Sequence, residues 1–255
     1  MRPSCGNRFE DFFADAAYIE LKNSLYNYFL RKRAVRNCVQ PEGRGAILEV
    51  GSGLSPMMTD TDGVVFSELS FSALRTLRKK QRRGFFVTAD AVHLPFKSGS
   101  FSWVVCSEVL EHLPDDRSAL GEIAAVMKQG GSLVLTFPHR RCYFARDDRF
   151  VNHLRRYELA EMEARLREAG LNPVVVQKVL GPLEKITMVL VISCITLLQR
   201  FRHGRTDAAY PAWLWKIVVP PFRWINYLFC LPVWLDARIA PRFLASVLLI
   251  RSVKL

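Results

Sequence analysis

The feature that most constrains the fold is an alternation of short apolar runs with amphipathic helical segments between Ala46 and Val179. Short apolar runs bounded by turn residues predict buried strands, and strands that alternate with helices predict a mostly parallel sheet with right-handed crossovers. A further apolar run near the C-terminus predicts one more strand. The expected strands cover 47–50, 64–66, 85–87, 103–106, 132–137, 174–179 and 247–253.

Changes in composition divide the chain into four segments. We expect a helical N-terminal cap over 1–45, an α/β core over 46–180, a hydrophobic, basic and Trp-rich insertion over 181–243, and the terminal strand over 244–255. A chain of 255 residues suits one α/β domain of ordinary size. The sequence therefore predicts an α/β fold of the doubly wound, Rossmann-like class, with a hydrophobic helical insertion between the sixth and seventh strands.

Composition limits the choice of partner and compartment. The formal net charge of +12 favours nucleic acid, anionic lipid headgroups or phosphorylated substrates. The six cysteines lie far apart without metal-ligand spacing, so we expect reduced thiols, a cytoplasmic location and no metal site. The first residues lack the apolar region of a secretory signal, which agrees with that location.

A glycine pair directly follows the first predicted strand. Gly51 and Gly53 let the backbone turn sharply and approach a ligand at the carboxyl edge of the sheet. Ser55 and Pro56 stand where the dinucleotide fingerprint has its third glycine, and Glu49 suits a ligand with a cationic amino end better than a pyrophosphate. A tight strand-to-helix turn without any ligand is the alternative interpretation.

Two acids follow the next two strands. Glu68 comes after the second strand, where a carboxylate can accept hydrogen bonds from both hydroxyls of a ribose. Asp90 comes after the third strand, where it can accept one from the exocyclic amine of an adenine. Each acid alone is also typical of a helix cap or a solvated loop. Together, at successive strand ends, they favour a nucleoside-binding site.

The chain at this point resembles the class I S-adenosylmethionine-dependent methyltransferases of the small-molecule and lipid-modifying kind, similar to methyltransferase type 11. The resemblance covers about 46–179 and implies S-adenosylmethionine as the cofactor and an antiparallel last strand. The motifs that carry it are Leu48–Gly53, Asp90, Leu94–Phe96, Phe101–Leu113, Lys128–Gly131 and Leu133–Pro138. The short first crossover, which contains Pro56, departs from the family's pattern, and Glu68 stands where Asp is also common.

The resemblance also implies roles for individual residues. The glycine loop would hold the methionine end of the cofactor, and the acid after the second strand would bind its ribose. The pair of residues after the third strand would bind its adenine, and the end of the fourth strand would lie beside its sulfonium. In that order the cofactor-binding residues are Glu49, Gly51, Ser52 and Gly53, then Glu68, then Asp90 and Ala91, then Ser107 and Glu108.

The acceptor site is less constrained by the sequence. Methyl transfer is an in-line displacement, and a base is needed only if the nucleophile must lose a proton. His139 and His153 are the candidate catalytic bases, because each lies between the fifth strand and the next helix. We further expect an anionic acceptor to be bound by four arginines of the same loop, since guanidinium groups pair well with phosphate. These are Arg140, Arg141, Arg155 and Arg156; a solvated charged surface is the alternative.

The insertion combines tryptophans and basic residues with few acids, which is typical of the headgroup region of a bilayer. Its uncharged run, 186–198, is shorter than the roughly 20 residues that span a membrane. Five prolines are expected to break the rest into short pieces. A segment lying on the membrane is favoured; a re-entrant hairpin, a buried helical cap and a dimer interface are alternatives. The prolines are Pro211, Pro220, Pro221, Pro232 and Pro241.

These observations predict methyl transfer to an anionic lipid or lipid-linked small molecule at the cytoplasmic face of a membrane, with an anionic membrane surface as a partner. The basic charge leaves an RNA or protein methyltransferase as an alternative, although no nucleic-acid-binding module is visible and nucleic acid is not the expected partner. A catalytically silent membrane adaptor with the same fold is a further alternative.

Overall fold

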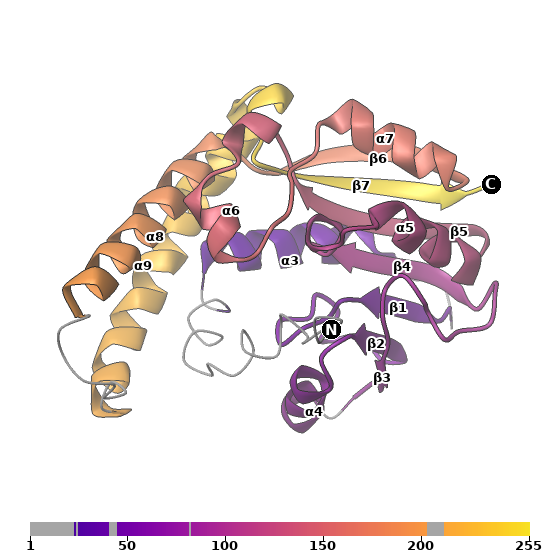
Figure 1. Cartoon of the computed structure of the whole chain (residues 1–255), viewed down its shortest axis with the longest axis horizontal. Helices are drawn as coiled ribbons and strands as arrows, with labels where there is room; N and C mark the ends of the chain where they lie inside the picture. The colour runs from indigo at the N-terminus through magenta and orange to yellow at the C-terminus, as the bar shows by residue number, and fades with distance from the viewer. Residues whose placement is uncertain (1–22, 24, 41–44, 82, 203–211) are drawn as a thin grey trace, which may run out of the picture.

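The computed structural model describes residues 23, 25–40, 45–81, 83–202 and 212–255. Its centre is one sheet of seven strands in the order β3-β2-β1-β4-β5-β7-β6 (Figure 1). Strands β1 to β5 pair in parallel, whereas β7 runs antiparallel to both β5 and β6. The predicted doubly wound fold with an antiparallel last strand is therefore confirmed.

Each predicted strand is present, and most extend beyond the predicted ends. The strands are β1 Ile47–Val50, β2 Val64–Glu68, β3 Phe85–Thr88, β4 Phe101–Ser107, β5 Met127–Pro138, β6 Leu171–Leu180 and β7 Val247–Lys254. The central strands have apolar residues on both faces, because helices cover the sheet on both sides. Strand β5 starts at Met127, directly after a helix, whereas the predicted strand begins at residue 132.

Two hydrophobic clusters lie on opposite faces of the sheet. Ile47 and Val105 belong to one cluster, and their neighbours Leu48 and Val104 belong to the other, as the alternation of side chains along a strand requires. Residues of α3 (Tyr26–Cys38), α4 (Phe71–Lys80) and α9 (Ala212–Ile239) join the first cluster, and residues of α5 (Asp116–Val126) and α7 (Leu159–Glu168) join the second. Helices α4 and α5 begin at side-chain caps, Ser70 and Asp115.

The remaining elements lie on the connections around β5 and β7. The short elements are η1 Leu110–His112, η2 Arg141–Tyr143, α6 Arg146–Phe150 and η3 Arg242–Leu244. Of the expected N-terminal cap, residues 1–22, 24 and 41–44 lie outside the described residues, and α3 is the helix that the structure describes there.

The insertion between β6 and β7 contains α8 (Pro182–Arg202) and α9, which contact each other at one end of the sheet (Figure 1). The prediction that prolines break this region is wrong for α9, because Pro220, Pro221 and Pro232 lie inside that continuous helix. Helix α9 packs against α3 and β6, so tertiary contacts support it where proline removes backbone donors. Within the described residues, no helix has the combined length and apolarity of a bilayer-crossing segment.

Candidate active site

A cavity of about 240 Å³ lies at the carboxyl edge of the sheet. The loop after β1 and the ends of β2, β3 and β4 line one part of it, as expected for a ligand site in an open α/β sheet. Helix α3 closes another wall, and α6 and α8 line the far end. The cavity therefore joins the predicted cofactor site to the base of the inserted helices.

The glycine loop brings its backbone close to the cavity. Gly51 and Gly53 have φ values of +67° and +52°, which favour glycine. A Cβ atom on Gly51 would lie 2.5 Å from Cγ2 of Val109, so space as well as conformation requires glycine here. The Ser52 hydroxyl lines the cavity, is buried and has no hydrogen-bond partner. Such an orphaned polar group indicates a ligand that supplies the missing hydrogen bond.

The two acids beside this loop hold its shape. The Glu49 carboxylate accepts hydrogen bonds from the backbone N–H groups of Met57 at 2.7 Å and Met58 at 3.0 Å. Burial raises the pKa of Glu49 to about 7, although these hydrogen bonds oppose the shift. Glu68 accepts hydrogen bonds from the N–H groups of Gly53 at 2.9 Å and Ser70 at 3.0 Å.

Glu49 and Glu68 differ in their access to the cavity. Glu68 lines it, whereas Glu49 is not among the described residues that do. The predicted direct contact of Glu49 with the cofactor is therefore replaced by a positioning role: Glu49 fixes the loop that carries Gly51, Ser52 and Gly53.

The other predicted cofactor-binding residues all line the cavity. Asp90 and Ala91 follow β3, and Oδ1 of Asp90 accepts a hydrogen bond from the N–H of Val92 at 3.1 Å. Ser107 ends β4 and Glu108 follows it; Glu108 has a φ of +56°, an uncommon conformation for a residue with a side chain. Because backbone strain often accompanies a functional position, this conformation agrees with a role for Glu108 at the cavity.

These residues fit S-adenosylmethionine. The glycine loop offers a close backbone approach and the unpaired Ser52 hydroxyl for the amino-acid end. Glu68 and Asp90 place carboxylates at successive strand ends, where ribose hydroxyls and an adenine amine would donate to them. Ser107 and Glu108 line the same cavity and would hold the sulfonium end of the cofactor.

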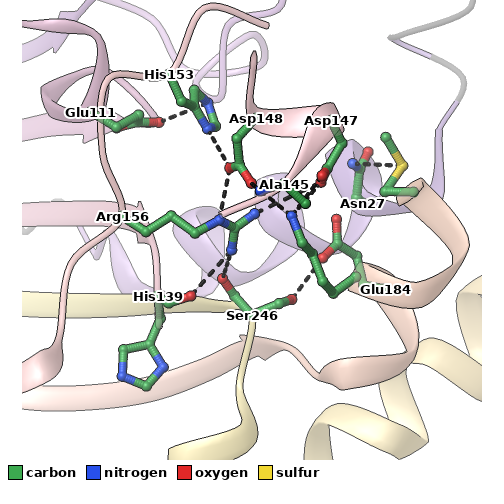
Figure 2. Close-up of polar contacts among 12 residues, drawn as sticks. Asn27, Glu111, His139, Ala145, Asp147, Asp148, His153, Arg156, Glu184 and Ser246 are labelled. Carbon is green, nitrogen blue, oxygen red and sulfur yellow. Dashed lines mark hydrogen bonds and ion pairs between the residues drawn. The ribbon is translucent and has the colours of Figure 1, made fainter. Parts of the chain in front are cut away.

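A cluster of buried charged residues occupies the far end of the cavity (Figure 2). Asp148 is at its centre: its carboxylate contacts Nδ1 of His153 at 2.9 Å, Nε of Arg156 at 2.7 Å and Nζ of Lys185 at 2.7 Å. Burial by itself would raise the pKa of Asp148, but the hydrogen bond with His153 and the two cations outweigh burial and lower it. Asp148 is therefore an anion that holds α6, the segment after it and α8 together.

Helix α8 enters this cluster through two neighbouring charged residues. Lys185 also contacts both carboxylate oxygens of Asp147, at 2.7 and 2.6 Å. Glu184 accepts a hydrogen bond from the Ser246 hydroxyl at 2.7 Å, and burial raises its pKa. Through these contacts α8 is fixed to the far end of the cavity.

The structure separates the two candidate histidines. His153 lines the cavity, whereas His139 is buried against β7, outside the residues that line the described cavity. Nδ1 of His139 lies 2.8 Å from the carbonyl oxygen of Ala245, and burial lowers the pKa of this imidazole. His139 thus does not line the described cavity, because its ring packs against the segment before β7, and this position disagrees with the predicted role as a base.

The predicted four-arginine anion site is also not formed. Arg140 pairs with Glu158 at 3.2 Å and Arg141 with Glu161 at 2.8 Å, because the loop after β5 folds back onto α7. Arg155 pairs with Asp116 at 3.3 Å. Of the four, Arg156 alone is among the described residues that line the cavity, and its guanidinium already contacts Asp148.

Sequence reasoning missed several cavity residues. Arg31 of α3 lines the cavity, has a buried Nε without a hydrogen-bond partner and lies 3.7 Å from Glu108. Asp147, Asp148 and Glu184 also line it. Asp147 and Asp148 were visible only as part of a charged run. A usable signal was the Glu184-Lys185 pair, because two charges at the start of an apolar helix require buried partners.

Part of the chain is similar to known methyltransferases. Residues 48–135 match the model of a family described as a methyltransferase domain. The chain is 35% identical over 98 residues to the demethylmenaquinone methyltransferase of Beutenbergia cavernae, covering 38% of this chain and 41% of that protein. It is 29% identical over 140 residues to the ubiquinone/menaquinone biosynthesis C-methyltransferase UbiE of Haemophilus ducreyi, covering 49% and 54%. The chain thus spans about half or less of the length of these relatives.

A solved structure agrees with the fold. An S-adenosylmethionine-dependent methyltransferase of Thermotoga maritima, described as a possible histamine N-methyltransferase, superposes with a TM-score of 0.61 at 19% identity, covering 97% of this chain and 98% of the other. Residues 48–135 therefore resemble a methyltransferase domain, and the chain shares the fold of a solved S-adenosylmethionine-dependent methyltransferase.

Proposed function

We propose that this protein transfers a methyl group from S-adenosylmethionine to a lipid or lipid-linked small molecule at the cytoplasmic face of a membrane. One observation carries the proposal: the cavity that begins at the glycine loop ends against Glu184 and Met188 of α8. Helix α8 of the insertion thus forms a wall of the proposed acceptor site. A hydrophobic acceptor held against this helix would reach the methyl group without crossing water.

The exposed surface of α9 supports docking on a membrane. Five large apolar residues recur every three or four positions, which places them on one face of the helix. Their exposed fractions run from 41% for Leu235 to 81% for Ile239, and burial of such side chains in a bilayer is favourable. The five residues are Trp224, Leu228, Leu231, Leu235 and Ile239. We call them the apolar stripe.

Basic and aromatic side chains accompany the apolar stripe. The Arg238 guanidinium lies 4.2 Å from the ring centroid of Trp234, and Arg242 follows in η3. Aromatic residues beside cations are typical of segments that lie in the headgroup region. The described cysteines Cys38, Cys106, Cys142 and Cys230 are free, in agreement with a reducing, cytoplasmic location.

The relatives support the class of acceptor. Two of them are named for methylation in menaquinone or ubiquinone biosynthesis. S-adenosylmethionine, when bound, supplies a methyl group on a sulfonium that needs no further activation. The chain's contribution would be to orient the acceptor, and positioning of this kind supplies about 7–11 kcal/mol.

Flotation and methyl-transfer assays test the proposal. Full-length protein would be floated with vesicles that contain anionic lipid, and methyl transfer from radiolabelled S-adenosylmethionine would be measured on extracted membrane lipids. We expect binding and lipid labelling for the native chain, and a loss of both for the double variant Trp224→Glu with Leu228→Glu. Phe85→Glu is the matched control, because Phe85 is 64% exposed but lies on edge strand β3.

The flotation and methyl-transfer assays test separate parts of the proposal. Labelling of a soluble acceptor by a protein that does not float would refute the membrane part of the proposal and retain the activity. A folded protein that binds S-adenosylhomocysteine but labels no acceptor would favour the adaptor alternative.

A further inference from the structure

Three potential ligands converge where η1 meets the segment after α6. A Glu111 carboxylate oxygen and one ring nitrogen each of His112 and His153 lie within 4.8 Å of one another. The two histidines line the cavity, and Glu111 is fully buried behind them. We propose that Glu111, His112 and His153 bind a divalent transition-metal ion, with an open coordination position toward the cavity.

Glu111 is the observation that points to a cation. Its side chain is 0% exposed, yet neither carboxylate oxygen has a hydrogen-bond partner. Nε2 of His153 lies 3.7 Å from Oε1, which is too far for a hydrogen bond. Because buried carboxylates are normally hydrogen-bonded, paired or bound to metal, a cation among these residues accounts for the unpaired oxygens.

His153 is oriented as a metal ligand would be. Its Nδ1 faces the Asp148 carboxylate at 2.9 Å, while Nε2 faces Glu111 (Figure 2). Arg156 and Lys185 hold that carboxylate in place. A carboxylate hydrogen-bonded to the far nitrogen is the usual support of a metal-binding histidine, because it fixes the tautomer and ring orientation.

His112 has a similar arrangement on the other side of the site. Its Nδ1 lies 3.3 Å from the carbonyl oxygen of Asn152, which orients the ring. The rings of His112 and His153 pack edge to face, with centroids 4.8 Å apart. Each ring therefore uses Nδ1 for a protein contact, and the proposal assigns the metal to Nε2 of each ring.

The ligand set indicates which ions would bind. Two imidazole nitrogens and one carboxylate suit Mn²⁺, Fe²⁺, Co²⁺ or Zn²⁺ better than Mg²⁺ or Ca²⁺, which prefer all-oxygen sites. No thiolate is required, so the cysteine spacing that excluded a zinc site in the sequence does not bear on this one. The site also gives His153 the role of a ligand instead of a general base.

The position of the metal site indicates how the acceptor would be activated. This part of the inference rests on the proposed function. A metal ion between His112 and His153 would lie beside Glu108 and could bind a hydroxyl oxygen of the acceptor and lower its pKa. The acceptor oxygen would then form a bond to the methyl carbon while the carbon–sulfur bond breaks and its electrons stay on sulfur. The hydroxyl proton would leave to water. We therefore infer a hydroxyl-bearing acceptor and methylation at oxygen.

Metal binding can be measured without any acceptor. Full-length protein would be treated with a chelator, dialysed, and titrated with Co²⁺ and Mn²⁺ by calorimetry, with bound metal counted by mass spectrometry. We expect about one equivalent per chain, a visible Co²⁺ spectrum, and affinity at least ~10–100-fold weaker in Glu111→Gln and His153→Gln. His139→Gln is the matched control, because it removes a buried histidine outside the cluster.

S-adenosylhomocysteine binding, measured on the same samples, reports folding of each variant. Wild-type protein that binds this ligand but no metal would overturn the proposed metal site and leave the proposed methyl transfer intact. Equal metal affinity in wild type and a folded Glu111→Gln variant would also overturn the site. Metal binding by a protein that methylates no lipid would support the site and count against the proposed function.

Discussion

The cavity is shaped by backbone groups at its glycine-loop end and by buried charged side chains at its α8 end. In the loop, the N–H groups of Gly53, Met57 and Met58 donate to two carboxylates from neighbouring strands. At the other end, Asp148 and Lys185 join segments that are far apart in the sequence. A site of the first kind depends on local chain conformation, whereas a site of the second kind depends on long-range assembly.

This difference affects how each end responds to substitution. The glycine loop has little room, so small increases in side-chain size should impair ligand binding while the fold survives. The charged cluster has balanced charges in a buried environment, so removing one partner leaves another uncompensated. We therefore expect variants of the cluster to change stability and variants of the loop to change affinity.

The largest expected effect is on stability, in Lys185→Met. This change leaves the buried Asp147 and Asp148 without the ammonium that contacts both, and breaking such a buried pair typically costs about 3–5 kcal/mol. The measurement is urea unfolding followed by circular dichroism. Arg83→Met is the control: its pair with Asp62 is 73% and 78% exposed, so the loss should stay under about 1 kcal/mol. Equal losses in both variants would mean that the cluster is effectively solvated.

The same contrast explains what the sequence could predict. The strands, their order of occurrence and the cofactor end follow from local patterns such as Gly51-Ser52-Gly53 and the acids Glu68 and Asp90 at strand ends. Such signals lie within a few residues of the strands that position them. The helical insertion was likewise visible as an uncharged run followed by a Trp-rich segment.

The α8 end of the cavity was predicted poorly, because its geometry depends on contacts between distant segments. His139 and His153 occupy similar places in the sequence, but one packs against Ala245 and the other against Asp148. The arginines after β5 were expected at the cavity, whereas α7 supplies Glu158 and Glu161 as partners for Arg140 and Arg141. Periodicity and spacing do not reveal which partner a charged residue selects.

The next largest effect concerns Glu49 and pH. The folded protein raises its pKa from the usual 4.5 to about 7, so the folded state binds this proton more tightly than the unfolded state. The associated stability is therefore fully present below pH 4.5 and is lost as pH rises through 7, by on the order of 3 kcal/mol. Unfolding of wild type and Glu49→Gln without cofactor, compared from pH 4.5 to 8, tests this. A constant difference between the two proteins over that range would contradict it.

The cofactor affinities of two glycine variants distinguish the effect of steric crowding from the effect of backbone conformation. In Gly51→Ala the new Cβ meets Val109 and the residue keeps an unfavourable φ of +67°, so we expect S-adenosylhomocysteine to bind about a hundredfold more weakly. Gly63→Ala is matched in conformation, with φ of +74°, but has nothing within 4 Å of the new Cβ. Calorimetry should show unchanged affinity in that control. Equal weakening in both would assign the effect to the backbone conformation alone.

The smallest expected effect is in Arg141→Ala. This guanidinium is 66% exposed and pairs with Glu161 on α7, so its loss should change stability by less than about 1 kcal/mol and methyl transfer by less than about twofold. Arg31→Ala is the comparison, because Arg31 lines the cavity beside Glu108 and should lower methyl transfer more strongly. Rates would be measured at saturating cofactor. If Arg141→Ala were the more damaging of the two, the acceptor would have to enter along the loop after β5, and the wall formed by α8 would no longer define its path.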